Sequence, residues 1–196
     1  ESILTLANEL HRPDAAFLAP DAAGGSWYPH SFLAPLEQNE PWLSSALRRV
    51  YRCVEETEAA GIGRDRIVLA GFSQGACLAA EFVARNPARW GGLVVLSGGL
   101  IGTGQTEGVP PEDKRFDYPG RLDGTPALVG CADRDPHIPR RRVEQTVVVL
   151  SEMQADVDGR IYEGLGHAVN RDEMEAFDRL LRSIPAPASP SSDPHG

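Results

Sequence analysis

Ser73 stands between two glycines in the sequence GFSQG at residues 71–75, between a strand-like and a helix-like stretch of the chain. The mostly apolar residues 66–70 before it are typical of a buried strand, and residues 76–85 after it are typical of a helix. A serine on so sharp a strand-to-helix turn projects its hydroxyl above the sheet as a nucleophile, and glycines on both sides let strand and helix approach closely. The backbone N–H of Gln74, at the start of the helix, is expected to point to where an oxyanion would form.

A serine hydroxyl is a poor nucleophile at neutral pH, so it needs a base beside it. The usual base is a histidine oriented by a carboxylate, and in a parallel sheet both must come from loops at the carboxyl ends of strands. His167 meets this requirement, because it follows the last predicted strand in a loop rich in glycine. The other four histidines fit less well: His11 precedes a strand, His30 lies in an aromatic loop that could line the site, His137 lies close to a candidate aspartate, and His195 lies in the tail.

The carboxylate is expected in the loop at residues 130–139, which also follows a predicted strand. Asp133 and Asp135 both qualify by position, and spacing alone does not choose between them. One would orient the imidazole, while the other would brace the loop or pair with Arg134. The chain order of serine, aspartate and histidine is the order found in α/β-hydrolases.

The rest of the chain alternates between predicted helices and strands, as the positioning of these loops requires. Helices are predicted over residues 2–11, 41–61, 76–85, 139–154 and from Asn170 to Ile184, and strands over 15–20, 66–70, 92–96, 127–131 and 160–163. The strands are continuously apolar rather than alternating, which indicates a parallel sheet covered by helices on both faces, an α/β fold. Residues 98–124 show no clear periodicity and are interpreted as a long excursion that could form a flap over the site.

Composition limits the possible functions. The 196 residues suffice for a single domain over 1–184, and the Pro- and Ser-rich tail 185–196 is predicted to be disordered. The net charge is −9, and the sequence shows no basic stripe that could neutralise phosphates. Both observations argue against a nucleic-acid partner. No apolar run is long enough for a transmembrane segment. The three scattered cysteines show no zinc spacing and favour a reducing, cytoplasmic setting.

Three stretches of the chain carry a specific resemblance to a known family. GFSQGA at 71–76, DPHIP at 135–139 and the Gly-His pair at 166–167 make the chain resemble the phospholipase/carboxylesterase family of α/β-hydrolases, which includes acyl-protein thioesterases and small bacterial esterases. The resemblance extends over roughly residues 1–184 and implies the α/β-hydrolase fold. It also implies a catalytic triad of Ser73, Asp135 and His167, because the family's acid stands in an Asp-Pro-x-Val-Pro pattern that matches Asp135.

The resemblance implies hydrolysis of small to medium acyl esters through an acyl-enzyme on Ser73, with no metal or cofactor. The segment at 27–29 resembles one that borders the acyl pocket in bacterial members. The residues expected to line an acyl groove are Trp27, Tyr28, Phe32, Leu100 and Ile101. The family also opens with a strand ending in a His-Gly-x-Gly-like loop that supplies the second oxyanion donor, so we expect about 20–30 residues containing it before Glu1. A homodimer is compatible with the same resemblance.

Two other functions are compatible with the same residues. One is a hydrolase of another substrate class, such as lactones or peptides. The other is a catalytically silent binding protein on a hydrolase scaffold. The presence of Ser73, Asp135 and His167 together argues against the silent scaffold, and labelling by a fluorophosphonate would separate the two, because only an activated serine reacts.

Overall fold

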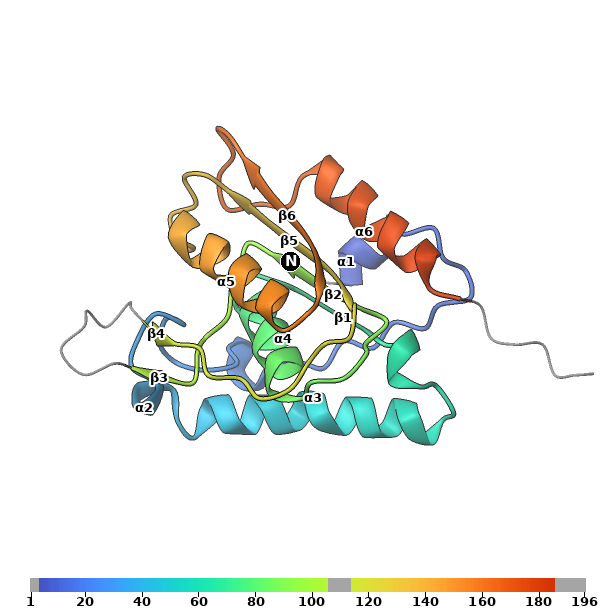
Figure 1. Ribbon diagram of the computed structural model, residues 1–196, viewed down its shortest axis with the longest axis horizontal. Coiled ribbons are helices and arrows are strands. Elements are labelled where there is room, and N and C mark those ends of the chain that lie inside the picture. The colour runs from blue at the N-terminus through green and yellow to red at the C-terminus, as the bar shows by residue number, and fades with distance from the viewer. Residues whose placement is uncertain (1–3, 106–113, 186–196) are drawn as a thin grey trace, which may run out of the picture.

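A four-stranded parallel sheet forms the centre of the molecule (Figure 1). The computed structural model describes residues 4–105 and 114–185, so all but the first residue of the predicted disordered tail lies outside the described residues. The strands, in the order in which they lie side by side, are β1 (Val68–Phe72), β2 (Gly92–Leu96), β5 (Pro126–Ala132) and β6 (Asp156–Tyr162). All neighbouring pairs are parallel, so the four carboxyl ends meet at one edge of the sheet. The predicted α/β architecture is confirmed. β2 and β5 form where they were predicted, whereas β1 lies two residues later than predicted and β6 begins four residues earlier.

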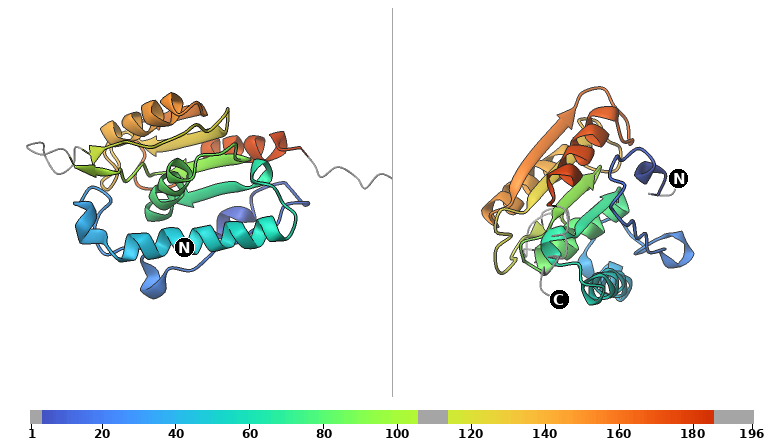
Figure 2. Two further views of the ribbon diagram at one scale, coloured as in Figure 1. Left: turned by 60° about the horizontal axis from the view of Figure 1, so that its bottom comes forward. Right: turned by 90° about the vertical axis from the view of Figure 1, so that its right-hand side faces the viewer.

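Helices cover both faces of this sheet (Figure 2). The long helices are α3 (Trp42–Ala59), α4 (Gln74–Arg85), α5 (Arg140–Glu152) and α6 (Arg171–Ser183). Successive residues of a strand point to opposite faces, and Leu93 and Val95 of β2 accordingly join the larger core formed with α3, α4 and α5. Val94 and Leu96 of the same strand instead pack with α6 in a second core. The continuous apolar runs of the sequence therefore reflect burial of both faces.

Two predictions for the beginning of the chain are wrong. Residues 15–20 form no strand, and the first helix, α1 (Leu4–Ala7), ends before residue 11. Phe17 and Leu18 are 41% and 65% exposed, so the apolar run that suggested a strand buries little surface. The backbone N–H of His11 donates to Asp178 of α6 rather than continuing a helix, and Pro13 follows two residues later.

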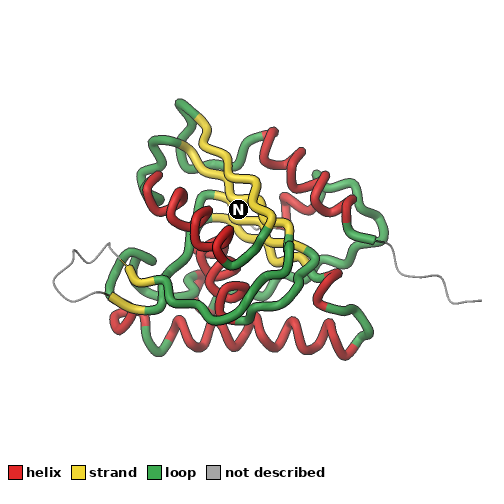
Figure 3. Tube along the Cα trace, viewed as in Figure 1, coloured by secondary structure: helices red, strands yellow, loops and turns green. Residues whose placement is uncertain are grey.

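Much of the remaining chain is loop, with a few short elements (Figure 3). These are α2 (Leu36–Asn39), the single 3₁₀ turns η1 (Ala23–Gly25) and η2 (Arg64–Arg66), and a two-stranded antiparallel sheet of β3 (Gly104–Gln105) and β4 (Lys114–Arg115). No helix in the described part of the chain is both long and apolar enough to cross a membrane.

The segment predicted as a flap begins as a fixed part of the core. Leu100 and Ile101 are fully buried, and the Leu100 N–H donates to the hydroxyl of Thr146 on α5. The N–H groups of Ile101 and Gly102 both donate to the buried carboxylate of Glu81 on α4. Part of the predicted flap, residues 106–113, lies outside the described residues. The described start of this segment is therefore anchored to two helices, and the prediction of a flap is wrong there.

Candidate active site

Ser73 lies on a strained turn between β1 and α4. Its φ and ψ of 56° and −121° fall in a region that non-glycine residues rarely adopt. Its N–H donates to the carbonyl of Leu96 at the end of β2, which holds the turn against the sheet. Gln74 is the first residue of α4, so its N–H has no acceptor within that helix.

The two glycines of the turn have different roles. A Cβ on Gly71 would lie 2.3 Å from the carbonyl carbon and oxygen of Gly75, so only glycine fits where the strand passes the helix. A Cβ on Gly75 would meet no atom within 4 Å. The close approach of strand and helix thus explains the glycine at position 71. The prediction that both glycines serve this approach is wrong for Gly75.

A chain of two hydrogen bonds joins Ser73, His167 and Asp135. The Nε2 atom of His167 lies 2.8 Å from Ser73 Oγ, and its Nδ1 lies 2.7 Å from Asp135 Oδ2. An ionised carboxylate only accepts hydrogen bonds, so Nδ1 carries the proton of the neutral ring and Nε2 is free to accept from the serine hydroxyl. Each residue follows the carboxyl end of a strand, Ser73 after β1, Asp135 after β5 and His167 after β6. The three residues selected from the sequence are therefore brought together in the geometry that activates a nucleophile.

Asp135 is held in its ionised form by its surroundings. Its side chain is fully buried, and burial alone would raise its pKa. Hydrogen bonds from His167 and from the backbone N–H groups of His137 and Ile138 outweigh this effect and place the pKa below its ordinary value. The neighbouring thiol of Cys131 donates to Oδ2 over 3.7 Å. Burial, followed by the charge of Asp135, raises the pKa of this thiol to about 12, so it remains a neutral donor.

The sequence left open which of the two aspartates braces the loop, and in the structure it is Asp133. Its Oδ1 accepts a hydrogen bond from the backbone N–H of Gly164 at 3.0 Å, in the loop that leads to His167. Its Oδ2 lies 3.7 Å from Nε of the exposed Arg134. Asp133 thus braces the histidine loop, while Asp135 contacts the imidazole.

Two aromatic rings flank His167 that the sequence analysis did not select. The ring of Phe72 lies 4.8 Å from the imidazole between centroids, and the ring of His137 lies 4.9 Å away at a steep angle. Both residues are sequence neighbours of triad members, which is the signal that could have identified them. The backbone N–H groups of His11 and His30 donate to the side chains of Asp178 and Asn39, respectively, and His195 lies outside the described residues.

The residues predicted to line an acyl groove are mostly buried. Trp27 is partly exposed, whereas Tyr28 and Phe32 are only 2% and 4% exposed and Leu100 and Ile101 are not exposed at all. All five pack in or against the larger core. Of this set, Trp27 alone is thus partly exposed, whereas the other four are part of the core.

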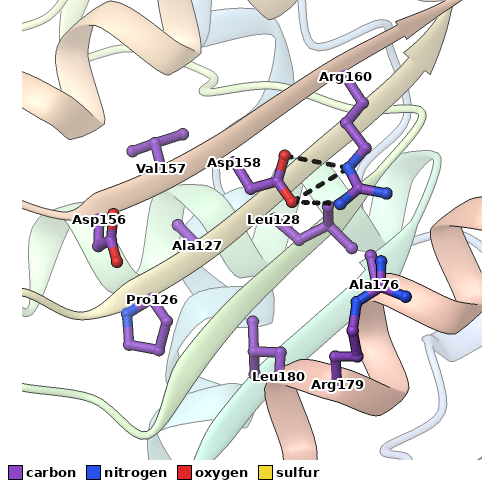
Figure 4. Close-up of a pocket in the computed structure, with 10 residues that line it drawn as sticks. All are labelled: Pro126, Ala127, Leu128, Asp156, Val157, Asp158, Arg160, Ala176, Arg179 and Leu180. Atoms are coloured by element: carbon purple, nitrogen blue, oxygen red, sulfur yellow. Dashed lines mark hydrogen bonds and ion pairs between the residues drawn. The ribbon is translucent and has the colours of Figure 1, made fainter. Parts of the chain in front are cut away.

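A hollow elsewhere on the molecule does not involve the triad (Figure 4). Pro126 and Asp156, which begin β5 and β6, lie at one end of it, and Arg179 and Leu180 of α6 form another wall. Arg160 in this hollow is ion-paired with Asp158. The triad follows the opposite, carboxyl ends of the strands, so the two sites are separate.

Comparison with known proteins adds a family to this geometry. Residues 13–184 match the phospholipase/carboxylesterase family. The chain belongs to that family. This membership, predicted from the GFSQGA, DPHIP and Gly-His stretches, is therefore confirmed.

Individual members agree in fold. A crystal structure of a phospholipase/carboxylesterase from Dyadobacter fermentans is 39% identical, with a TM-score of 0.83 over 92% of this chain and 82% of that one. Acyl-protein thioesterase 1 of Kluyveromyces lactis is 28% identical over 71% of this chain and 59% of the relative. A probable carboxylesterase of Oryza sativa subsp. japonica is 25% identical over 74% of this chain and 52% of the relative. The chain thus spans somewhat more than half the length of these two curated relatives. The structural similarity to the Dyadobacter fermentans protein confirms the predicted α/β-hydrolase fold.

Proposed function

We propose that this chain is a serine hydrolase that cleaves small to medium acyl esters through an acyl-enzyme intermediate. The observation that carries the proposal is the hydrogen-bonded chain from Ser73 Oγ through His167 to the buried carboxylate of Asp135. Membership of the phospholipase/carboxylesterase family supports the choice of a carboxylic ester as substrate. The names of the relatives include both carboxylesterase and acyl-protein thioesterase, and the same acyl transfer serves oxygen and sulfur esters.

In the first step, Ser73 Oγ attacks the carbonyl carbon of the ester while His167 Nε2 takes the hydroxyl proton. The resulting imidazolium is stabilised by Asp135, whose lowered pKa keeps it ionised beside the positive charge. The N–H of Gln74, at the N-terminus of α4, donates a hydrogen bond to the negatively charged carbonyl oxygen and stabilises it. The tetrahedral intermediate collapses, His167 returns the proton to the leaving alkoxide or thiolate, and the acyl group remains on Ser73.

In the second step, water replaces the leaving group. His167 removes a proton from the water as it attacks the acyl carbon, and then returns a proton to Ser73 Oγ as the acid is released. The reaction consumes one water and yields one carboxylic acid and one alcohol or thiol. The mechanism uses no metal or cofactor.

The test is hydrolysis of p-nitrophenyl esters from acetate to palmitate by the wild-type chain and by Ser73→Ala. Ser151→Ala is the matched control, because Ser151 is an exposed serine on α5 whose hydroxyl donates to the Val147 carbonyl of its own helix. We expect hydrolysis and fluorophosphonate labelling to survive in the control and to disappear in Ser73→Ala. Labelling that persists in Ser73→Ala would mean that the reactive nucleophile is another residue, and absence of labelling from the wild-type chain would favour a silent scaffold. Either result would contradict the proposal.

A further inference from the structure

The side chain of Gln74 is occupied by a loop far away in sequence. Its Oε1 accepts a hydrogen bond from the backbone N–H of Trp27 at 2.7 Å, and its Nε2 donates to the backbone carbonyl of Tyr28 at 2.8 Å. Ser26 Oγ lies 3.3 Å from the same amide and also donates to the Tyr28 carbonyl at 2.7 Å. One amide therefore pairs with the backbone donor of Trp27 and with the backbone acceptor of Tyr28.

These bonds require an amide of this length. Glutamate would accept from the Trp27 N–H, but it would place a second acceptor against the Tyr28 carbonyl. Methionine has a similar length and flexibility, but it offers no N–H donor and only a weak acceptor. Because the site is partly buried, backbone groups left without these partners would cost free energy.

The tether fixes aromatic side chains relative to the nucleophile. Gln74 directly follows Ser73, and its own N–H is the proposed oxyanion donor. On the tethered segment, Tyr28 is buried in the core, whereas the ring of Trp27 packs against that core and remains partly exposed. A shift of the segment would therefore move the exposed face of Trp27 while leaving the Ser73 hydrogen bonds in place.

We propose that the side chain of Gln74 is a positioning residue that holds the segment 26–28 beside Ser73 and so sets the preference of the enzyme for the acyl group through Trp27. This inference rests on the proposed esterase function. It assigns Gln74 a second role, distinct from that of its backbone N–H, which every substitution except proline retains.

The experiment compares Gln74→Met and Gln74→Glu with the wild-type chain in two measurements. The first is the ratio of kcat/KM for p-nitrophenyl butyrate to that for the acetate. We expect this ratio to change by about tenfold, the effect of losing one or two hydrogen bonds. The matched control is Gln38→Met, because Gln38 is an exposed glutamine on α2, and it should leave the ratio unchanged. A role in loop stability alone would lower both rates equally.

Trp27→Leu completes a double-mutant cycle. If Gln74 acts through Trp27, Gln74→Met should change the ester ratio in the wild-type background and have little effect in the Trp27→Leu background. Additive effects of the two substitutions, or an unchanged ratio in both Gln74 variants, would overturn the inference. Thermal melting of each variant confirms that it is folded, and Gln74→Glu provides a second test should Gln74→Met fail to fold.

The second measurement is independent of catalysis. Amide hydrogen exchange of the segment 26–28 should become faster in both Gln74 variants and stay unchanged in Gln38→Met. Unchanged exchange would overturn the tether even where the ester ratio changes. If the wild-type chain neither hydrolyses esters nor labels with a fluorophosphonate while exchange responds as expected, the esterase function fails and the structural tether stands by itself.

Discussion

The carboxylate of Asp133 accepts a hydrogen bond from the N–H of Gly164, and this bond ties the loop after β5 to the loop after β6. The first loop carries Asp135 and the second carries His167. The backbone N–H of Asp133 also donates to the carbonyl of Tyr162 at 2.9 Å, at the end of β6. Asp133 therefore helps to hold the loops that carry Asp135 and His167 beside each other.

Asp133→Ala should lower kcat/KM for p-nitrophenyl acetate by about tenfold, because one hydrogen bond that positions His167 is lost. The Asp133→Asn variant keeps an oxygen acceptor of the same shape and should retain most of the activity. The measurement is steady-state hydrolysis by the two variants alongside the wild-type chain. Equal losses in both variants would show that charge, and not this hydrogen bond, is what Asp133 contributes.

Chemistry restricts the residue type and position of the predicted triad, and this selects Ser73 and His167, whereas the choice of Asp135 over Asp133 rests on the resemblance to the family. Ser73, Asp135 and His167 lie in the turn or loops that follow β1, β5 and β6, and a parallel sheet places such residues together. The surroundings were less predictable. Apolar residues such as Leu100 and Phe32 are expected both in the lining of a groove and in a core, so their type does not distinguish the two. Only the packing of α4 and α5 shows that they are buried. The tether of Gln74 depends on a contact across 46 or more residues that no local pattern records.

Asp135→Asn should abolish nearly all hydrolysis, by about ten-thousand-fold, because an amide can donate to His167 Nδ1 and so favours the tautomer in which Nε2 carries the proton and cannot accept one. Fluorophosphonate labelling should slow in parallel, since both depend on the same base. The measurement is the labelling rate at constant pH. Near-normal labelling would mean that Asp135 does not orient His167.

Asp135→Asn should also change how the free energy of unfolding depends on pH. Because the pKa of Asp135 is lower in the folded chain than its ordinary value of 3.8, the ionised group stabilises the fold above that pH. This contribution is lost as the pH falls through the folded-state pKa, where the folded chain takes up the proton. The difference in unfolding free energy between the wild-type chain and Asp135→Asn should therefore shrink as the pH falls below 3.8, as urea titrations would show. A difference that does not vary with pH would contradict this assignment.

Alanine substitutions at the two glycines of the serine turn, Gly71 and Gly75, should have different effects on the melting temperature. Gly71→Ala forces a Cβ to within 2.3 Å of the Gly75 carbonyl, so the turn must move, and both the melting temperature and fluorophosphonate labelling should fall. Gly75→Ala meets no atom within 4 Å and lies inside α4, where alanine is favoured over glycine by roughly 1 kcal/mol. Its melting temperature should stay the same or rise. A lower melting temperature for Gly75→Ala than for Gly71→Ala would show that the steric argument is wrong.

Glu81 should be among the most sensitive positions for stability, although it lies further along α4 from Ser73 and takes no part in the proposed reaction. Its carboxylate is completely buried and accepts hydrogen bonds from Ile101 N–H, Gly102 N–H and the Tyr118 hydroxyl, the last at 2.6 Å. Burial, followed by the charge of Glu81, raises the pKa of Tyr118 far above its ordinary value, so this phenol remains a donor. The ion pair with Arg85 completes the set of partners.

Glu81→Leu leaves those donors and the Arg85 charge without an acceptor, and it should lower the free energy of unfolding by about 3–5 kcal/mol. Tyr118→Phe removes one donor and should cost about 1 kcal/mol. Glu58→Gln is the matched control, because Glu58 pairs with Arg64 where both side chains are 35% exposed, and such a pair contributes about 0–1 kcal/mol. Urea unfolding of the three variants provides the measurement. If Glu81→Leu proves no more harmful than Glu58→Gln, the segment after β2 must be held by Thr146 and Arg142 of α5, which bond to Leu100 from the other side.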